Sequence, residues 1–316
     1  MIGAKSVLTE KEKIELLKKC VAVKTDTRLR NRLRNVGFYR LRLYSRFLLS
    51  KSHIMKTKPS EDLLYNLYDF DEKLRLLLFV FCKKAEIRLK ASVSTVCTQT
   101  EGTPLFYTLR NSYTPSKSNN DKLEKQKNIK YFEVFLKDLL KDEKKVRTHN
   151  ISKHPEVAEM RPTGRRVTDK LPADVLFSYL DFGSVVSMYS YLRGDLRKSV
   201  LKHHGTRNNY GKQTTKQFDT WLDAIRNLRN SCAHHNILIG KTSNIILPEF
   251  GEEELIMSQT DLFSRLYALK KVLSQKEGEA LGKCVERLVL HGKVDVGLMG
   301  ILPQNWKEKY DRIQIL

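Results

Sequence analysis

The chain lacks several features that define common protein classes. Its five cysteines are an odd number, are scattered and include no C-x-x-C pair, which argues against a zinc ribbon or a disulfide framework and suits a reducing compartment. The longest apolar run, residues 74–82, is interrupted by Arg75, whereas a membrane-spanning helix needs about 20 largely apolar residues. The N-terminal stretch has no hydrophobic segment of signal-peptide type. We therefore expect a cytoplasmic protein with no membrane segment.

Familiar phosphate-binding and metal-binding signatures are missing too. The patterns G-x-x-x-x-G-K-[ST], G-x-G-x-x-G, H-E-x-x-H and G-x-S-x-G do not occur. The acidic stretch 69–72 has the composition of a cation site, but in a helix Asp69 and Asp71 point in nearly opposite directions. We interpret His203 and His204, which lie in a polar, loop-like stretch, as surface residues, with RNA contact as the alternative. We expect no metal and no other cofactor.

Acidic residues are few relative to basic ones. The chain holds 58 Lys and Arg against 36 Asp and Glu, a formal net charge of +22. A field of this sign attracts polyanions and speeds their encounter with the protein. Nucleic acid is therefore the expected partner, an anionic membrane surface is the main alternative, and a role confined to protein partners does not account for the charge.

Arginine dominates the basic residues of one N-terminal stretch, residues 27–49. The guanidinium group matches phosphate oxygens in a bidentate manner, so this composition favours phosphate contact. A solvated helix face is the alternative. We expect this stretch to contact RNA through Arg28, through Arg30 and through position 33. Further along the chain, we expect RNA contacts from Arg165 and Arg166.

Patterns typical of β-strands are nearly absent, because residues 243–250 are the only candidate. Apolar residues instead recur at steps of three and four. This periodicity predicts breaks near Gly37, Gly183 and Gly278. The predicted helical regions are residues 9–20, 27–49, 59–97, 172–204, 214–236 and 260–289.

The stretch from about 110 to 170 differs from the rest of the chain. It is polar, basic and rich in turn residues around one amphipathic helix at 129–145, which indicates an excursion rather than a second core. The sequence thus predicts an all-α fold: one domain over residues 1–316, built as a helical bundle with a basic loop and helix excursion.

Residues 229–236, R-N-S-C-A-H-H-N, form the polar end of an otherwise amphipathic helix. Apolar residues anchor one side of residues 218–228, and the polar cluster lies beyond them. Asn230 and His234 are about 40° apart around a helix and share a face, whereas Arg229 and His234 are about 140° apart. If both act on one phosphate, either the helix bends after Asn230 or two copies of the motif combine, most simply in a homodimer.

Histidine beside arginine suits cleavage of RNA without a metal. Histidine exchanges protons near neutral pH, arginine stabilises charge on the phosphate, and the ribose 2′-hydroxyl serves as the nucleophile. Arg229 and His234 are the predicted catalytic residues, and Asn230 and His235 the supporting ones. The alternative is an ordinary helix C-terminus, with histidines favoured by the helix dipole and Asn236 as the cap.

The motif resembles the R-x4–6-H motif of HEPN-superfamily ribonucleases. Together with residues 67–93, 180–193 and 302–306, the stretch 221–236 is similar to the AbiD/AbiF group of abortive-infection proteins, in the order of that family. Residues 110–170 match poorly.

The resemblance implies an all-helical HEPN-like bundle in the bacterial cytoplasm, acting in phage defence as a toxin. It implies a metal-independent endoribonuclease, with RNA as substrate or partner and Arg229 and His234 as catalytic residues. A non-cleaving protein that holds a structured noncoding RNA is the alternative function.

Overall fold

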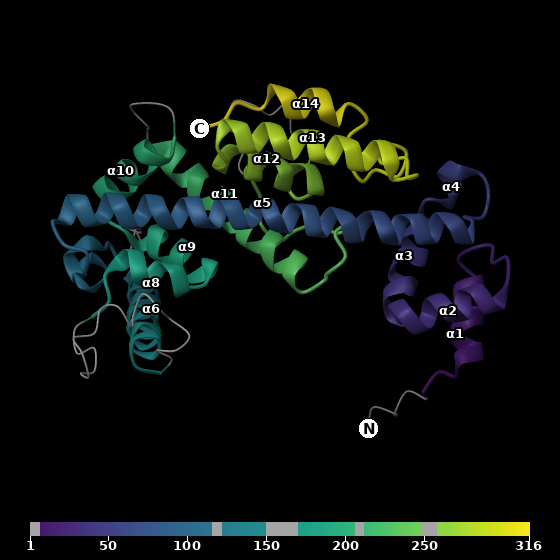
Figure 1. Ribbon diagram of the computed structural model, residues 1–316, viewed down its shortest axis with the longest axis horizontal. Coiled ribbons are helices and arrows are strands. Elements are labelled where there is room, and N and C mark those ends of the chain that lie inside the picture. Colours follow the sequence, from purple (N-terminus) through teal and green to yellow (C-terminus); the bar gives the residue numbers. More distant parts are fainter. Residues whose placement is uncertain (1–6, 116–121, 150–169, 206–211, 248–257) are drawn as a thin grey trace, which may run out of the picture.

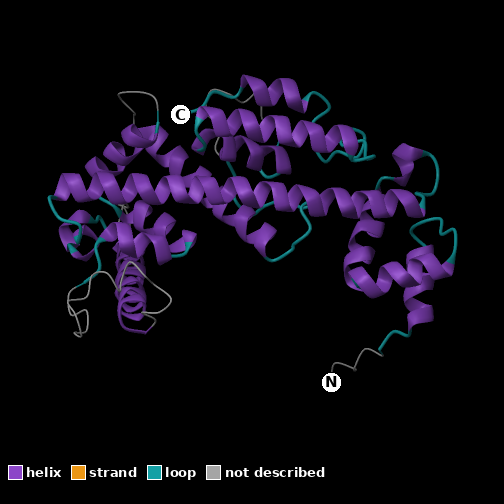
Figure 2. Ribbon diagram, viewed as in Figure 1, coloured by secondary structure: helices purple, strands orange, loops and turns teal. Residues whose placement is uncertain are grey.

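A computed structural model describes residues 7–115, 122–149, 170–205, 212–247 and 258–316, and every regular element in these ranges is a helix (Figure 2). The prediction of an all-α fold is confirmed. The longest helix, α5 (Glu61–Glu101), runs along the whole molecule (Figure 1). In the described ranges, no helix is long and apolar enough to cross a membrane.

The other helices hang from α5 or cover it, which gives the molecule the shape of an arch (Figure 1). Below one end lie α1 (Glu10–Lys18), α2 (Asp26–Val36) and α3 (Phe38–Ser50), with α4 (Ser52–Met55) leading into α5. Below the other end lie α6 (Lys122–His149), α8 (Ala173–Tyr179) and α9 (Phe182–Tyr191). On the upper side lie α10 (Gly194–His204), α12 (Leu262–Val272), α13 (Gln275–His291) and α14 (Trp306–Arg312). Short 3-10 turns follow α5 at Phe106–Thr108 and Arg110–Ser112.

Helix α5 has well-defined ends. The Ser60 hydroxyl caps its first turn by accepting the N–H of Leu63 at 3.1 Å, and two acidic residues follow where the helix dipole favours them. The helix ends at Gly102, whose φ of 68° is the left-handed conformation that glycine adopts without strain. Its buried side chains reach α3, α8, α10, α11 and α13, so α5 is the central support of the fold.

Two hydrophobic clusters hold the described residues together. The larger surrounds α5, and α6 joins it through the buried Phe132 and Leu139. The predicted excursion therefore has one helix packed on the main core. A smaller cluster within α1–α3 consists of Ile14, Leu17, Leu29, Leu33 and Leu41.

The chain breaks within a few residues of all three glycines, as predicted, but only Gly37 lies at the break itself, between α2 and α3. Gly183 lies inside α9, which begins one residue earlier because the Asp181 side chain accepts the N–H of Ser184. Gly278 lies inside α13, whose break from α12 falls at Ser274, the start of a capping box with Glu277. Residues 243–247 form no strand, and 248–250 lie outside the described residues.

Candidate functional site

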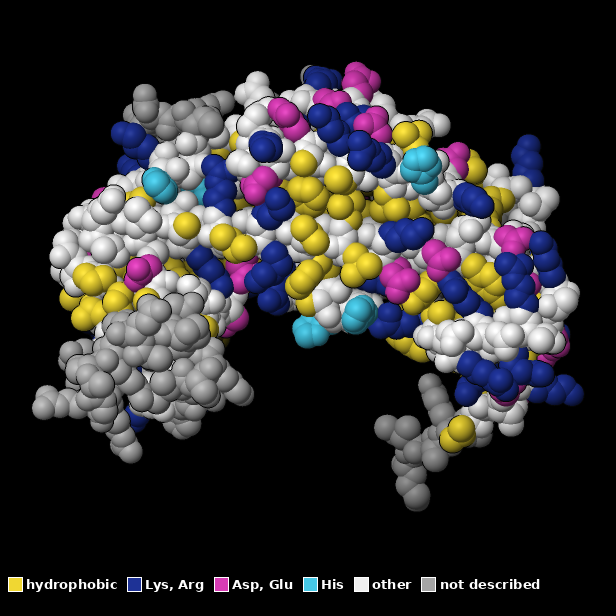
Figure 3. All heavy atoms as spheres, viewed as in Figure 1, with side chains coloured by type: hydrophobic (Ala, Val, Ile, Leu, Met, Phe, Trp, Pro, Cys, Tyr) yellow, Lys and Arg dark blue, Asp and Glu magenta, His cyan; other side chains and the backbone are white. Residues whose placement is uncertain are grey.

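Helix α11 (Lys212–Ala233) carries the predicted catalytic motif at its C-terminal end. Its apolar side chains are buried as predicted, with Phe218, Leu222 and Ile225 fully enclosed. They anchor the helix against α5, α9 and α12. The end of α11 then projects below the middle of α5 into the hollow of the arch (Figure 1), where histidine side chains lie at the surface (Figure 3).

The helix ends in a Schellman motif. The N–H of Asn236 donates to the carbonyl of Ser231 at 2.9 Å, and the N–H of His235 donates to the carbonyl of Cys232 at 3.2 Å. His235 takes the left-handed conformation with φ of 54°, one residue before the asparagine that the sequence suggested as the cap. The motif is therefore a helix end, and at the same time His234, His235 and Asn236 are all exposed.

No bend brings Arg229 and His234 together. Helical hydrogen bonding continues through Ala233, and the N–H of His234 still donates to the carbonyl of Asn230 at 2.9 Å. Asn230 and His234 are both exposed, at the spacing that places them on one face. Arg229 is turned toward α5, and one quarter of its side chain is exposed. Within one chain, the two predicted catalytic side chains therefore lie on different sides of a straight helix.

Arg229 is held by residues of α5 and by its neighbour. Its Nε lies 3.8 Å from Glu86 Oε2, its guanidinium stands over the Phe79 ring at 5.9 Å, and its Nη1 donates to Asn230 Oδ1 at 3.1 Å. These contacts direct the guanidinium toward α5.

Glu86 is the buried anion of this site. Only 2% of its side chain is exposed, yet Lys83 and Lys90 each place Nζ 2.9 Å from its carboxylate. Burial alone raises the pKa of Glu86, but hydrogen bonds from Lys90 and Lys83 outweigh it and leave the pKa lowered. The carboxylate thus stays charged among three cations. Sequence reasoning missed Glu86, although lysines three before and four after a glutamate in a helix are a readable signal.

Asp71 fixes the segment that follows the motif. Its carboxylate is fully buried, and Oδ1 accepts the N–H groups of Leu238 and Ile239, each at 3.1 Å. Oδ2 accepts from the Tyr44 hydroxyl and from Arg75. Burial raises the pKa of Asp71, and these donors oppose that rise. One side chain of α5 thereby joins α3, α5 and the chain leaving α11.

The acidic stretch around Asp71 is no cluster of metal ligands. As predicted, Asp69 points away from Asp71: it is half-exposed and pairs with Arg32 of α2. Across the ranges that the structure describes, no group of three or more His, Cys, Asp or Glu side chains is placed to hold a metal ion.

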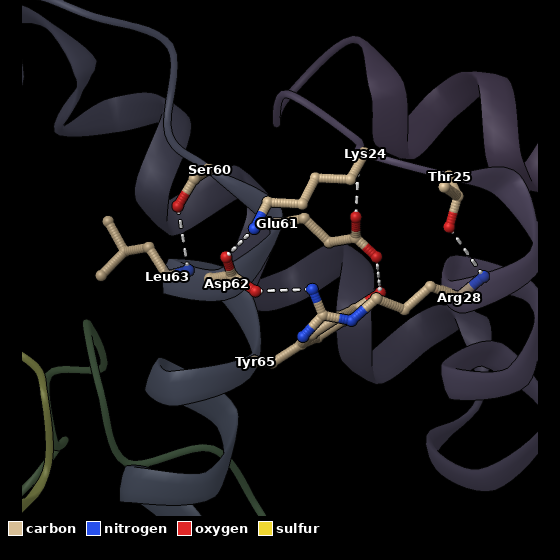
Figure 4. Close-up of polar contacts among 8 residues, drawn as sticks. All are labelled: Lys24, Thr25, Arg28, Ser60, Glu61, Asp62, Leu63 and Tyr65. Atoms are coloured by element: carbon tan, nitrogen blue, oxygen red, sulfur yellow. Dashed lines mark hydrogen bonds and ion pairs between the residues drawn. The ribbon is translucent and has the colours of Figure 1, made fainter.

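The basic positions near the N-terminus are engaged within the chain. Figure 4 shows Arg28 reaching Asp62, with Nη1 2.6 Å from Oδ1, and its guanidinium also lies over the Tyr65 ring at 5.1 Å. Arg30 pairs with Glu10. Position 33 is a leucine buried in the small cluster, so the expectation of a basic contact there is wrong.

Arg28 and Arg30 still expose 47% and 44% of their side chains, so the pairs do not remove them from the surface. Arg165 and Arg166 lie outside the described residues.

The expectation that His203 and His204 lie at the surface holds only for His203. The His204 ring is buried against Phe218; Nε2 donates to the carbonyl of Val272 at 2.7 Å, which leaves Nδ1 as the acceptor for the Ser92 hydroxyl at 3.4 Å. Burial is the main cause that lowers the pKa of His204 to about 3. This histidine is a neutral core residue.

Comparison with known proteins places the chain in a family. A family model described as Abi-like protein matches residues 31–240, which include most of the helices around α5 and the whole motif of α11. The chain therefore belongs to the Abi-like protein family, and this membership supports a role in abortive infection. Searches of the curated proteins and of the solved structures gave no match.

Proposed function

We propose that this protein is an endoribonuclease of an abortive-infection system, in which Arg229 and His234 cleave RNA. The observation that carries the proposal is the exposed polar end of α11: a helix whose apolar side is buried presents Asn230 and His234 at the surface of a strongly basic protein. The R-x4-H spacing resembles that of HEPN ribonucleases, and the Abi-like family membership agrees with this assignment.

The reaction is a transesterification at one phosphate. His234 accepts the proton of a ribose 2′-hydroxyl, the 2′-oxygen forms a bond to phosphorus, and the bond from phosphorus to the 5′-oxygen breaks. The leaving oxygen takes up a proton, from a histidine or from water, which gives a 5′-hydroxyl and a 2′,3′-cyclic phosphate. Arg229 stabilises the charge that gathers on the phosphate oxygens in the transition state.

A homodimer brings the two catalytic side chains together. Because α11 is straight, Arg229 of one chain and His234 of another meet more readily than the pair within a chain. The surface beside the site suits a second copy: Leu76 and Val80 of α5 are 62% and 52% exposed, and their four-residue spacing puts them about 40° apart. Phe79, over which Arg229 lies, follows Leu76 by three residues on the same helix.

The proposal is tested with His234→Ala and with His203→Ala, a change of an exposed histidine outside the motif. We expect His234→Ala to lower the rate of single-stranded RNA cleavage by at least about 100-fold, since proton transfer by a positioned group contributes that much. The control should cleave normally. RNA affinity and melting temperature should stay unchanged in both, because affinity comes from distributed phosphate contacts. Unfolding of the His234→Ala protein would instead make His234 structural.

The alternative is a protein that holds a structured noncoding RNA without cutting it. The net charge of +22 supports this role as well as it supports a nuclease. In that case Arg229 would contact phosphate, and the wild-type protein would bind RNA tightly while its strand remained intact.

A further inference from the structure

A cavity of about 570 Å³ opens between α5 and α8, in the surface near the candidate site. Ile87 and Phe177 give it an apolar side, and Ser94, Thr95 and Ser178 contribute hydroxyl groups. Asp174, Lys83 and Lys90 add charges of both signs. This volume and this mixture of an apolar wall with a few polar groups are typical of pockets that bind small organic groups.

The cavity is joined to Arg229 through Glu86. Lys83 and Lys90 line the cavity and also pair with the carboxylate of Glu86. The same carboxylate lies next to Arg229. Lys90 Nζ is further engaged by the carbonyl of Leu180 at 2.6 Å, so Lys83, which is 39% exposed, is the lysine with room for a ligand. Figure 3 shows Lys and Arg side chains gathering where α5 roofs the hollow between α8 and the end of α11.

We propose that this cavity binds one unpaired nucleotide of the RNA substrate, next to the phosphate that is cut. This inference rests on the proposed function for its choice of RNA. The base lies against Ile87 and Phe177, and Lys83 contacts the adjacent phosphate. Bases of single-stranded RNA are recognised in this manner, splayed from the strand, packed on one face and hydrogen-bonded at their edges.

The cavity also sets a preference among bases. The exposed carboxylate of Asp174 accepts hydrogen bonds and donates none, so it favours bases with an exocyclic amino group over uracil. A base paired in a duplex cannot enter, because its edge is already used. The site therefore selects a single-stranded position in the substrate.

The test fills the cavity with Thr95→Trp and compares it with Gln99→Trp, one turn further along α5. Both positions are exposed, and only Thr95 lines the cavity. Both changes are made in full-length protein that carries His234→Ala, so that RNA stays intact. Fluorescence anisotropy measures the affinity for a labelled ten-nucleotide single strand and for a blunt duplex of the same sequence.

We expect Thr95→Trp to weaken single-strand binding by about tenfold or more, the loss that corresponds to one stacked base. Duplex binding, and both affinities of Gln99→Trp, should change less than about twofold. Unchanged single-strand affinity in Thr95→Trp overturns the proposal, and so does an equal loss for single strand and duplex.

A second variant tests the same cavity if the tryptophan substitution disturbs the fold. Asp174→Ala removes an exposed side chain, and we expect it to abolish the preference for oligocytidine over oligouridine while total affinity changes little. A wild-type protein that binds both oligomers equally contradicts the assignment. All these measurements are of binding, so they are independent of cleavage. If the cavity variants behave as expected but the wild-type protein never cuts RNA, only the nuclease proposal is refuted.

Discussion

His234 and His235 are adjacent in sequence but differ in backbone conformation. His235 occupies the left-handed position of the Schellman motif, where glycine is the usual residue and a side chain costs about 1–2 kcal/mol. Strained backbone positions often lie at functional sites, so the strain at His235 is consistent with a functional role for this turn.

We predict that His235→Gly raises the free energy of unfolding by about 0.5–1 kcal/mol, because it removes this strain. His235→Ala, which keeps a Cβ, should give no such gain. Urea unfolding of the two variants measures the difference. Cleavage should persist in His235→Gly, because we assign proton transfer to His234; loss of cleavage equal to that in His234→Ala would contradict this ranking.

The exposed residues of the site could be read from the sequence, whereas the distant partners of its buried residues could not. The motif of α11 stands out because polar residues replace an apolar pattern at its end. Glu86 and Asp71 act through partners that the fold brings from elsewhere, 143 residues away for Arg229 and more than 160 for Leu238. His204 looked like a surface residue for the same reason, since only the packing of α10 against α5, α11 and α12 buries it.

At the scale of elements, the Asp71 carboxylate ties three segments together. We predict that Asp71→Ala lowers the free energy of unfolding by about 3–5 kcal/mol, because it leaves Arg75, 3% exposed, without its buried anion. Asp69→Ala, two residues earlier, breaks a half-exposed pair and should cost less than about 1 kcal/mol. Equal losses in urea unfolding would show that Asp71 is no special support.

His204 joins the ends of α10 and α12, and its titration gives the fold a pH dependence. Its pKa is about 3 in the folded protein and about 6.5 in an unfolded chain, so between these two pH values the unfolded state binds the proton more readily than the folded state. Stability should fall through this group by about 1.4 kcal/mol per pH unit between pH 6.5 and 3.

We predict that His204→Gln removes this part of the pH dependence while His203→Gln, a change at an exposed neighbour, leaves it in place. Unfolding free energies at pH 5 and pH 7 measure both. If the wild type and His204→Gln lose the same stability between these two pH values, His204 does not titrate in this manner.

Helix breaks show which local signals are reliable. Gly37 ends α2 with a φ of 87°, a true requirement for glycine. Gly278 instead allows a neighbouring side chain to pack closely on α13, because a Cβ there would lie 3.1 Å from Ile315 Cδ1. Glycine marks a close approach as readily as a turn, and only the packed structure separates the two. The capping box at Ser274 was the better local signal for the break.

At the scale of the whole molecule, the arch places the end of α11 in a hollow between two groups of helices (Figure 1). The all-α class follows from apolar periodicity, but the arch does not, because it depends on how far α5 extends beyond the helices packed at its centre. The small cluster within α1–α3 likewise lies apart from the core around α5, which the periodicity alone does not predict.

A composite site across a dimer has a direct test. We predict that mixing Arg229→Ala protein with His234→Ala protein restores part of the cleavage, because each mixed dimer keeps one intact arginine and one intact histidine on opposite chains. Each variant alone should be inactive. Sedimentation and a subunit-exchange assay establish that mixed dimers form; exchange without recovered cleavage, or an active monomer, would rule out the composite site.

The central claim is that Arg229 and His234 cleave RNA through its own 2′-hydroxyl. The most direct measurement incubates purified protein with single-stranded RNA in EDTA and identifies the new ends. We predict 2′,3′-cyclic phosphate and 5′-hydroxyl ends from the wild type and intact RNA from His234→Ala. Intact RNA with the wild type, equal cleavage by the variant, or 5′-phosphate ends would contradict the claim.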